Sequence, residues 1–140
     1  MIQRKQTLWL LLATIAAFLT LKFPFYTGNI LDATINVKAF KLLDARFNIL
    51  ITILSVAVGV IALITIFLYN DRKRQMLISV VNLVLSLGVI VLYYLQTKNF
   101  VDGAYSITSL LTLIIPVLII MAIIGIRKDE KLIKSVGRLR

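Results

Sequence analysis

The amino-acid sequence predicts an all-α integral membrane protein, built as a bundle of four transmembrane helices. Of its 140 residues, 60% are hydrophobic and 16% are charged, whereas soluble domains are nearer half apolar. The apolar residues gather in four stretches, each close to the roughly 20 residues that cross a bilayer as a helix. Basic residues gather in alternate connections, as expected for successive crossings. We therefore treat residues 1–140 as one membrane domain without internal repeats.

The first predicted span covers residues 7–26 and follows the basic residues Arg4 and Lys5. A cleaved signal peptide begins in a similar way. No cleavage site of small residues follows this stretch, however, which favours a retained span.

The connection after the first span is the only long polar one. From Leu31 to Val37, apolar and polar residues alternate with the period of a half-buried strand. A short extracytoplasmic strand is one interpretation, and an irregular loop on the membrane surface is the other, because a lone strand needs a partner. Residues 39–46 look helical and are expected to lead into the next span.

The second predicted span, residues 47–69, contains no charged residue. Ser55, Gly59 and Ala62 fall on one stripe of this helix, and such small residues allow a neighbouring helix to approach closely. Packing within the chain is the default use of this face, and dimerisation is the alternative.

A basic turn at residues 70–75 leads to the third predicted span, residues 76–95. Asn82 lies well inside this span, with Ser79 and Ser86 on the same helical face. An amide in hydrocarbon is expected to hydrogen-bond to a neighbouring helix, so a structural contact is favoured over a substrate site.

The last connection, residues 96–106, is short and carries a turn signal at Asp102 and Gly103. Phe100 and Tyr105 can pair with or pack on the strand expected in the first connection. The two connections would then form a small external cap.

The fourth predicted span, residues 107–126, contains Pro116, which removes a backbone hydrogen bond to the carbonyl of Thr112 and is expected to kink the helix. Thr112 joins Ser79, Asn82 and Ser86 as a candidate polar contact inside the membrane. The remaining residues, 127–140, are predicted to form a basic amphipathic cytoplasmic helix.

The distribution of basic residues predicts the topology. Eleven of the 16 Lys and Arg residues precede the first span, join the second span to the third, or lie in the tail, and five lie in the other two connections. Both termini are therefore predicted to be cytoplasmic. The net charge of +10 is explained first by this orientation, so a nucleic-acid partner is not favoured.

The residue types present disfavour enzymatic chemistry. The chain has no Cys and no His, which removes thiolate nucleophiles and the commonest metal ligand. We find no nucleophile–base pair, metal-ligand cluster or glycine-rich phosphate loop. No catalytic residue, cofactor, metal or small-molecule substrate is therefore predicted. Ion-coupled transport is also disfavoured, because no ionisable residue lies in the middle of a predicted span.

The candidate docking residues belong to the predicted cytoplasmic face, where they can contact anionic lipid or a partner. They are Arg4, Lys5, Arg72, Lys73, Arg74, Arg127, Lys128, Asp129, Glu130, Leu132, Ile133, Lys134, Val136, Arg138 and Leu139.

Both ends of the sequence carry recognisable motifs. They are Met1-Ile2-Gln3-Arg4 with Gln6-Thr7, and Ile126-Arg127-Lys128-Asp129-Glu130 with Leu132, Lys134-Ser135 and Arg138-Leu139-Arg140. These motifs resemble those of an uncharacterised membrane family, the domain of unknown function 4293, found mainly in Bacteroidetes-type bacteria. The resemblance covers the whole chain and implies four spans, but it supplies no reaction. The family often has an acidic residue where Gly137 stands.

Three functions remain open from the sequence. The leading hypothesis is a non-enzymatic structural or accessory subunit that docks through its cytoplasmic face on a larger membrane complex or on further copies of itself. The second is a transporter of small molecules or lipids with a polar cleft near Asn82. The third is a protein whose tail senses anionic lipid in the inner leaflet.

Overall fold

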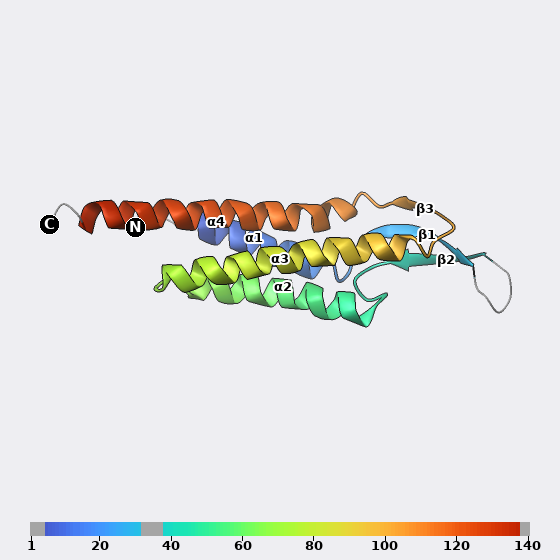
Figure 1. Ribbon diagram of the computed structural model, residues 1–140. Helices are drawn as coiled ribbons and strands as arrows, with labels where there is room; N and C mark the ends of the chain where they lie inside the picture. Colours follow the sequence, from blue (N-terminus) through green and yellow to red (C-terminus); the bar gives the residue numbers. More distant parts are fainter. Residues whose placement is uncertain (1–4, 32–37, 138–140) are drawn as a thin grey trace.

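The chain folds into four helices that lie side by side and a small sheet that extends the bundle at one end (Figure 1). The computed structural model describes residues 5–31 and 38–137 and, within these, the side chains of residues 5–30 and 40–133. The helices are α1 (Lys5–Leu19), α2 (Ile49–Phe67), α3 (Arg72–Thr97) and α4 (Ser109–Gly137). Both α1 and α3 pack against α2 and α4, so the four helices form a ring around a shared core.

The two ends of the bundle differ in character. At one end α1 begins, α2 turns into α3, and α4 ends (Figure 1). We call this the basic end, after the charged side chains described there: Lys5, Asp71, Arg72, Lys73, Arg74, Arg127, Lys128, Asp129, Glu130 and Lys131. The opposite end, which carries the strands, is the sheet end.

Three helices are long and apolar enough to cross a membrane: α2, α3 and the part of α4 from Ser109 to Ile133. The fourth, α1, is apolar but has 15 residues. The predicted first span is therefore wrong at its C-terminal end, because α1 ends at Leu19 and Tyr26 already belongs to a strand. Composition could not show this, since apolar residues occur in buried helices and strands alike.

The sheet joins the two connections at the sheet end. Its strands, in the order β2-β1-β3, are β2 (Lys38–Leu43), β1 (Tyr26–Leu31) and β3 (Asp102–Tyr105). Both pairings are antiparallel, and Tyr26 lies opposite Tyr105. The ring centroids of Tyr26 and Phe100 are 5.3 Å apart. The expectation that the second connection pairs with the first is thus confirmed.

Two local expectations at the sheet end are wrong. The segment 39–46 was expected to be helical, but most of it forms β2, because pairing with β1 outweighs the local preference for helix. Asp102 and Gly103 were expected to form a turn, but they begin β3. The strand expected between Leu31 and Val37 falls largely on residues 32–37, which lie outside the described part of the chain.

At the basic end the turn is shorter than expected. Asp71 caps α3 by accepting a hydrogen bond from the backbone N–H of Arg74 at 3.2 Å, so the helix already begins at Arg72. The expected separate tail helix is instead the continuation of α4, which runs without a break through Pro116 to Gly137.

The small-residue face of α2 packs within the chain, as expected by default. Ser55, Gly59 and Ala62 are buried. A Cβ atom added to Gly59 would lie 3.3 Å from the ring of Phe18 and 3.4 Å from the Cβ of Ala17, so α1 approaches α2 closely here.

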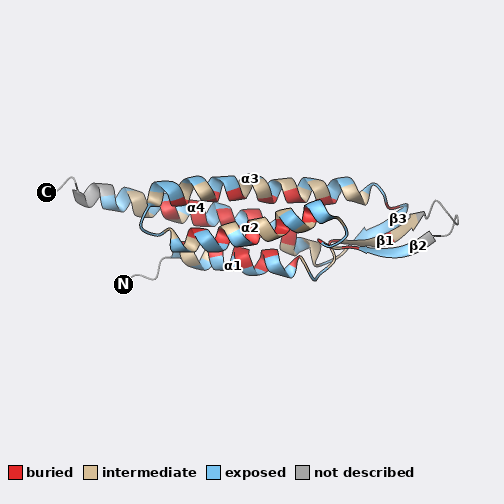
Figure 2. Ribbon diagram, turned by 90° about the horizontal axis from the view of Figure 1, so that it is seen from below, coloured by how far each residue is buried: buried red, intermediate tan, exposed pale blue. Residues whose placement is uncertain are grey.

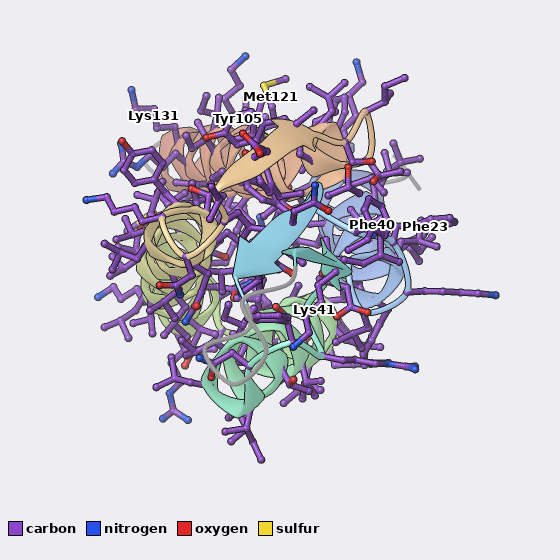
Figure 3. All side chains as sticks on the ribbon, turned by 90° about the vertical axis from the view of Figure 1, so that its right-hand side faces the viewer. Phe23, Phe40, Lys41, Tyr105, Met121 and Lys131 are labelled. Carbon is purple, nitrogen blue, oxygen red and sulfur yellow. The ribbon has the colours of Figure 1, made fainter. Side chains whose placement is uncertain are left out.

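The outside of the bundle is apolar along its length. Buried residues line the facing sides of the helices, and exposed ones cover the outer sides (Figure 2). Viewed from the sheet end, outer side chains such as Met121 point away from the bundle (Figure 3). Many of these exposed side chains are large and apolar, among them Leu8, Ile53, Val84, Leu110 and Val117.

A glycine pair sets the distance between β1 and β3, and replacing it should loosen the sheet. Gly28 lies opposite Gly103, and a Cβ on Gly28 would lie 2.8 Å from the Cα of Gly103 and closer still to the carbonyl of Asp102. We expect Gly28→Ala to lower the unfolding free energy by about 1–3 kcal/mol, the usual cost of overpacking. Thermal unfolding in detergent measures this.

Gly88→Ala is the matched control, because nothing lies within 4 Å of the Cβ that it adds to α3. It should be neutral or slightly stabilising, since Ala favours helix by roughly 1 kcal/mol over Gly. Equal unfolding temperatures for Gly28→Ala and wild type would show that the strands can separate without cost.

Candidate functional site

Seven basic and three acidic described side chains meet at the basic end. Arg72, the first residue of α3, forms an ion pair with Asp129 of α4, with 3.0 Å between Nη1 and Oδ2. The side chains of Arg72 and Asp129 are 14% and 33% exposed, so water screens this pair less than a surface pair. Arg74 pairs with Asp71 at 3.0 Å in a more exposed position. The first pair ties two helices together, and the second stays within the cap of α3.

Two adjoining depressions open at this end. The first, of about 430 Å³, lies between α4 and the beginnings of α1 and α3, and we call it the α1–α4 groove. It is lined by Lys5, Gln6, Arg72, Gly125, Lys128, Asp129, Leu132 and Ile133. The second, of about 440 Å³, is the α3–α4 groove. It is lined by Asn70, Asp71, Arg72, Lys73, Glu130 and Ile133.

The inner face of α4 continues beyond the helices that cover it. Ile119, Ala122 and Ile126 are buried in the core, and the helical repeat places Ile133 two turns beyond Ile126 on the same face. Figure 1 shows α4 extending past the start of α1 and the α2–α3 turn. Ile133 is accordingly 58% exposed, and its neighbour Leu132 is 64% exposed.

Three amide side chains are buried in the core of the bundle: Gln6 of α1, and Gln75 and Asn82 of α3. The Nε2 of Gln75 donates to the carbonyl of Thr65 at 3.1 Å. Its Oε1, and both amide atoms of Gln6 and Asn82, have no hydrogen-bond partner among the described residues. Asn82 is thus buried, and the bond expected from it to a neighbouring helix is not found among the described residues.

The hydroxyl groups beside Asn82 bond within their own helix. Ser79 donates to the carbonyl of Gln75, and Ser86 donates to the carbonyl of Leu83, each at 2.8 Å. Thr112 is buried and, with Thr20, Ser55 and Ser86, lines a void of about 10 Å³, close to the space that one water molecule occupies. Asn82 lines neither this void nor either groove.

Sequence reasoning missed Gln6 and Gln75. For Gln75 a signal existed, because Gln75, Ser79, Asn82 and Ser86 recur at spacings of four, three and four, which is one stripe of a helix. Gln75 was assigned to the turn instead. Gln6 belongs to the N-terminal motif that carries the family resemblance, but that motif gives no indication that its side chain is buried.

Part of the predicted docking set cannot be placed. Arg4, Arg138 and Leu139 lie outside the described residues, and of Lys134 and Val136 only the helical backbone is described. Within the described part of the chain, no cluster of three or more His, Cys, Asp or Glu residues could hold a metal ion.

A comparison with known protein families identifies the family of this chain. The sequence profile of the domain of unknown function DUF4293 matches residues 2–139. The chain belongs to this family. The resemblance seen in the terminal motifs is thereby confirmed. No curated protein and no solved structure matches the chain significantly.

The buried amide of Asn82 offers a direct test of the polar core. Asn82→Leu replaces an amide that has no partner among the described residues with an apolar side chain of similar size. We expect the unfolding temperature in detergent to stay the same or rise, because an unsatisfied buried polar group costs about 1–3 kcal/mol. Gln75→Leu is the contrasting variant and should lower that temperature, because it removes the bond to Thr65. A clear loss of stability in Asn82→Leu would indicate that this amide is bonded through ordered water.

Proposed function

We propose that this DUF4293 protein is a multi-pass protein of a bacterial inner membrane, with its basic end in the cytoplasm. We further propose that it acts as a non-enzymatic accessory subunit that docks on a larger membrane-associated complex through that end. The apolar outer surface of the helices and the exposed end of α4 support the two parts of this proposal.

Embedding in a membrane is supported by the three long apolar helices and by the apolar outer face. As the fourth span, α1 is too short to cross the bilayer by itself. Its 15 residues give a length of about 22 Å, whereas the hydrocarbon core is about 30 Å thick. Local thinning of the bilayer, or the apolar residues Leu21 and Phe23 that follow the helix, would complete the crossing. The orientation follows from the greater number of basic side chains at the basic end.

The absence of Cys from the sequence makes the orientation easy to test. Lys73→Cys at the basic end and Lys41→Cys in β2 each introduce one thiol at an exposed position. In intact spheroplasts, an impermeant maleimide should label Lys41→Cys and should reach Lys73→Cys only after lysis. The reverse pattern would show that the orientation is opposite to the one proposed. Labelling of both variants before lysis would show that the two ends do not lie on opposite sides of the membrane.

Docking is supported by the apolar residues at the exposed end of α4. Ile133 continues a face of α4 that is buried two turns earlier, at Ile126. Its neighbour Leu132 is also exposed, and basic residues flank both. A partner that covers this surface would carry an apolar patch rimmed by acidic residues, because such a patch complements both features. The transport alternative has less support, because Asn82 lines neither groove nor the small void described above.

The docking proposal predicts a loss of partner recovery on changing Ile133. Ile133→Ser removes apolar contact area, and it should reduce by at least tenfold the yield of a stoichiometric partner crosslinked in native membranes, since a buried anchor is worth roughly 2 kcal/mol. Phe40→Ser is the matched control, because Phe40 is at least as exposed as Ile133 but lies in β2 at the other end. No stoichiometric partner for the wild type, or equal losses in both variants, would contradict the proposal.

A further inference from the structure

We infer that the α1–α4 groove binds the phosphate group of an anionic phospholipid. The inference rests on the membrane embedding proposed above, but it does not depend on docking to a protein. Four features of the groove support it: its charge, the burial of that charge, its apolar lining and its depth along the bundle.

The groove collects positive charge from three helices. Lys5 comes from α1, Arg72 from α3 and Lys128 from α4, and Asp129 is the one acidic residue in the lining. Asp129 is already paired with Arg72 through Nη1. Because a guanidinium carries five N–H groups, Arg72 keeps donors for a second anion. The three basic residues therefore leave an excess of positive charge that a phosphate can balance.

Burial strengthens the interaction of this positive charge with an anion. The Arg72 side chain is only 14% exposed, so an anion that reaches it interacts through less water than it would at a surface lysine. Lys5 and Arg72 are also the first residues of α1 and α3, so the partial positive charges of these two helix N-termini lie beside the groove. The Asp129 carboxylate fixes the position of the guanidinium before any ligand arrives.

The rest of the lining is apolar and favours a lipid over a free phosphate ion. Leu132 and Ile133 form one wall. At Gly125, where an added Cβ would lie only 3.1 Å from the Cβ of Gln6, α1 packs directly on α4 and closes the groove. A hydrated ion would leave these walls in contact with water, whereas an amphiphile covers them while its phosphate meets the basic residues. Exposed apolar side chains on the same two helices, Leu8 of α1 and Ile124 of α4, offer contacts for acyl chains.

The depth of the groove suits a headgroup. Ile126 is the last residue of α4 identified as buried in the apolar core, and Lys128 and Asp129 follow directly. In an embedded bundle this boundary lies at the headgroup layer, where basic pockets between helices bind anionic lipids. A volume of about 430 Å³ is within the range of small-ligand sites.

The test compares two double variants of the full chain that remove the same charge from the same end. Lys5→Gln/Lys128→Gln removes two lysines from the groove, and Arg127→Gln/Lys131→Gln removes two exposed basic residues outside its lining. Native mass spectrometry in a neutral detergent measures binding of phosphatidylglycerol and of phosphatidylcholine with identical acyl chains. We expect the wild type to prefer phosphatidylglycerol by about tenfold, the groove variant to lose that preference, and the control to keep most of it.

A further variant checks the role of Arg72. Arg72→Gln/Asp129→Asn removes the guanidinium without leaving a lone buried carboxylate, and it should also lose the preference for phosphatidylglycerol. Displacement of phosphatidylglycerol by millimolar inorganic phosphate would overturn the lipid assignment in favour of a free anion. Equal losses in the groove variant and the control would overturn the site in favour of diffuse attraction.

Three further results distinguish a failure of the lipid site from a failure of the docking proposal or of membrane embedding. Equal binding of both lipids, combined with loss of a crosslinked protein partner in the groove variant, would assign the groove to an acidic protein segment instead. Extraction of the wild type from membranes by alkaline carbonate would contradict membrane embedding itself. If the chain resists extraction and still shows no lipid preference, the lipid site alone is wrong.

Discussion

The apolar outer surface of the helices is the constraint on which the rest of the structure depends. Large apolar side chains cover the outside, while amide and hydroxyl side chains lie among the buried residues. In the membrane proposed above, such a surface is stable, and every backbone N–H and C=O at that depth must be bonded within the protein. Helices meet this requirement individually, but an open sheet does not. Among the described strands, β2 and β3 form the two edges of the sheet, and the sheet extends beyond the end of the bundle instead of lying beside the helices.

The sheet also determines how the helices are held together. Because β1 follows α1 and β3 precedes α4, their pairing joins the chain's two helix–helix connections at the sheet end. Phe25 stacks on Tyr93 of α3 with 4.6 Å between ring centroids, and Leu43 and Ala45 are buried in the same cluster. This packing attaches the sheet to the core at the sheet end of the bundle. At the other end, the Arg72–Asp129 ion pair between α3 and α4 stands beside two open grooves. The bundle is thus closed at one end and open at the other, which places the surface available for binding at the basic end.

The sequence predicted those features that depend on local composition, and it missed those that depend on distant contacts. Four apolar stretches and their polar connections follow from hydropathy alone, as does the burial of Asn82 inside a span. The position at which α1 ends could not be predicted from hydropathy, because the strand that follows it is defined by pairing with Leu43 and Tyr105, which are far away in sequence. The grooves depend on how far α4 extends past its neighbours, and their ion pair joins residues 57 positions apart. The relative positions of helix ends leave no periodic pattern in a single sequence. The charged residues could therefore be named as candidates, but their proximity in space could not be predicted.

The two uses proposed for the basic end share residues, and this connects them energetically. Leu132 and Ile133 line the α1–α4 groove and are also the apolar residues offered to a partner. A lipid that covers their inner side and neutralises Lys5 and Lys128 still leaves exposed basic side chains at the basic end, among them Lys73, Arg127 and Lys131. The positive electrostatic potential that attracts an acidic partner is then weaker, but the apolar surface that the partner covers is less hydrated. Binding of one ligand therefore changes the affinity for the other, and linkage requires that the change be equal in both directions. Its sign depends on whether charge or apolar contact dominates the docking energy. Because exposed charges at an interface rim contribute little and buried apolar anchors contribute most, a bound lipid that leaves the outer side of Ile133 uncovered should weaken docking only slightly.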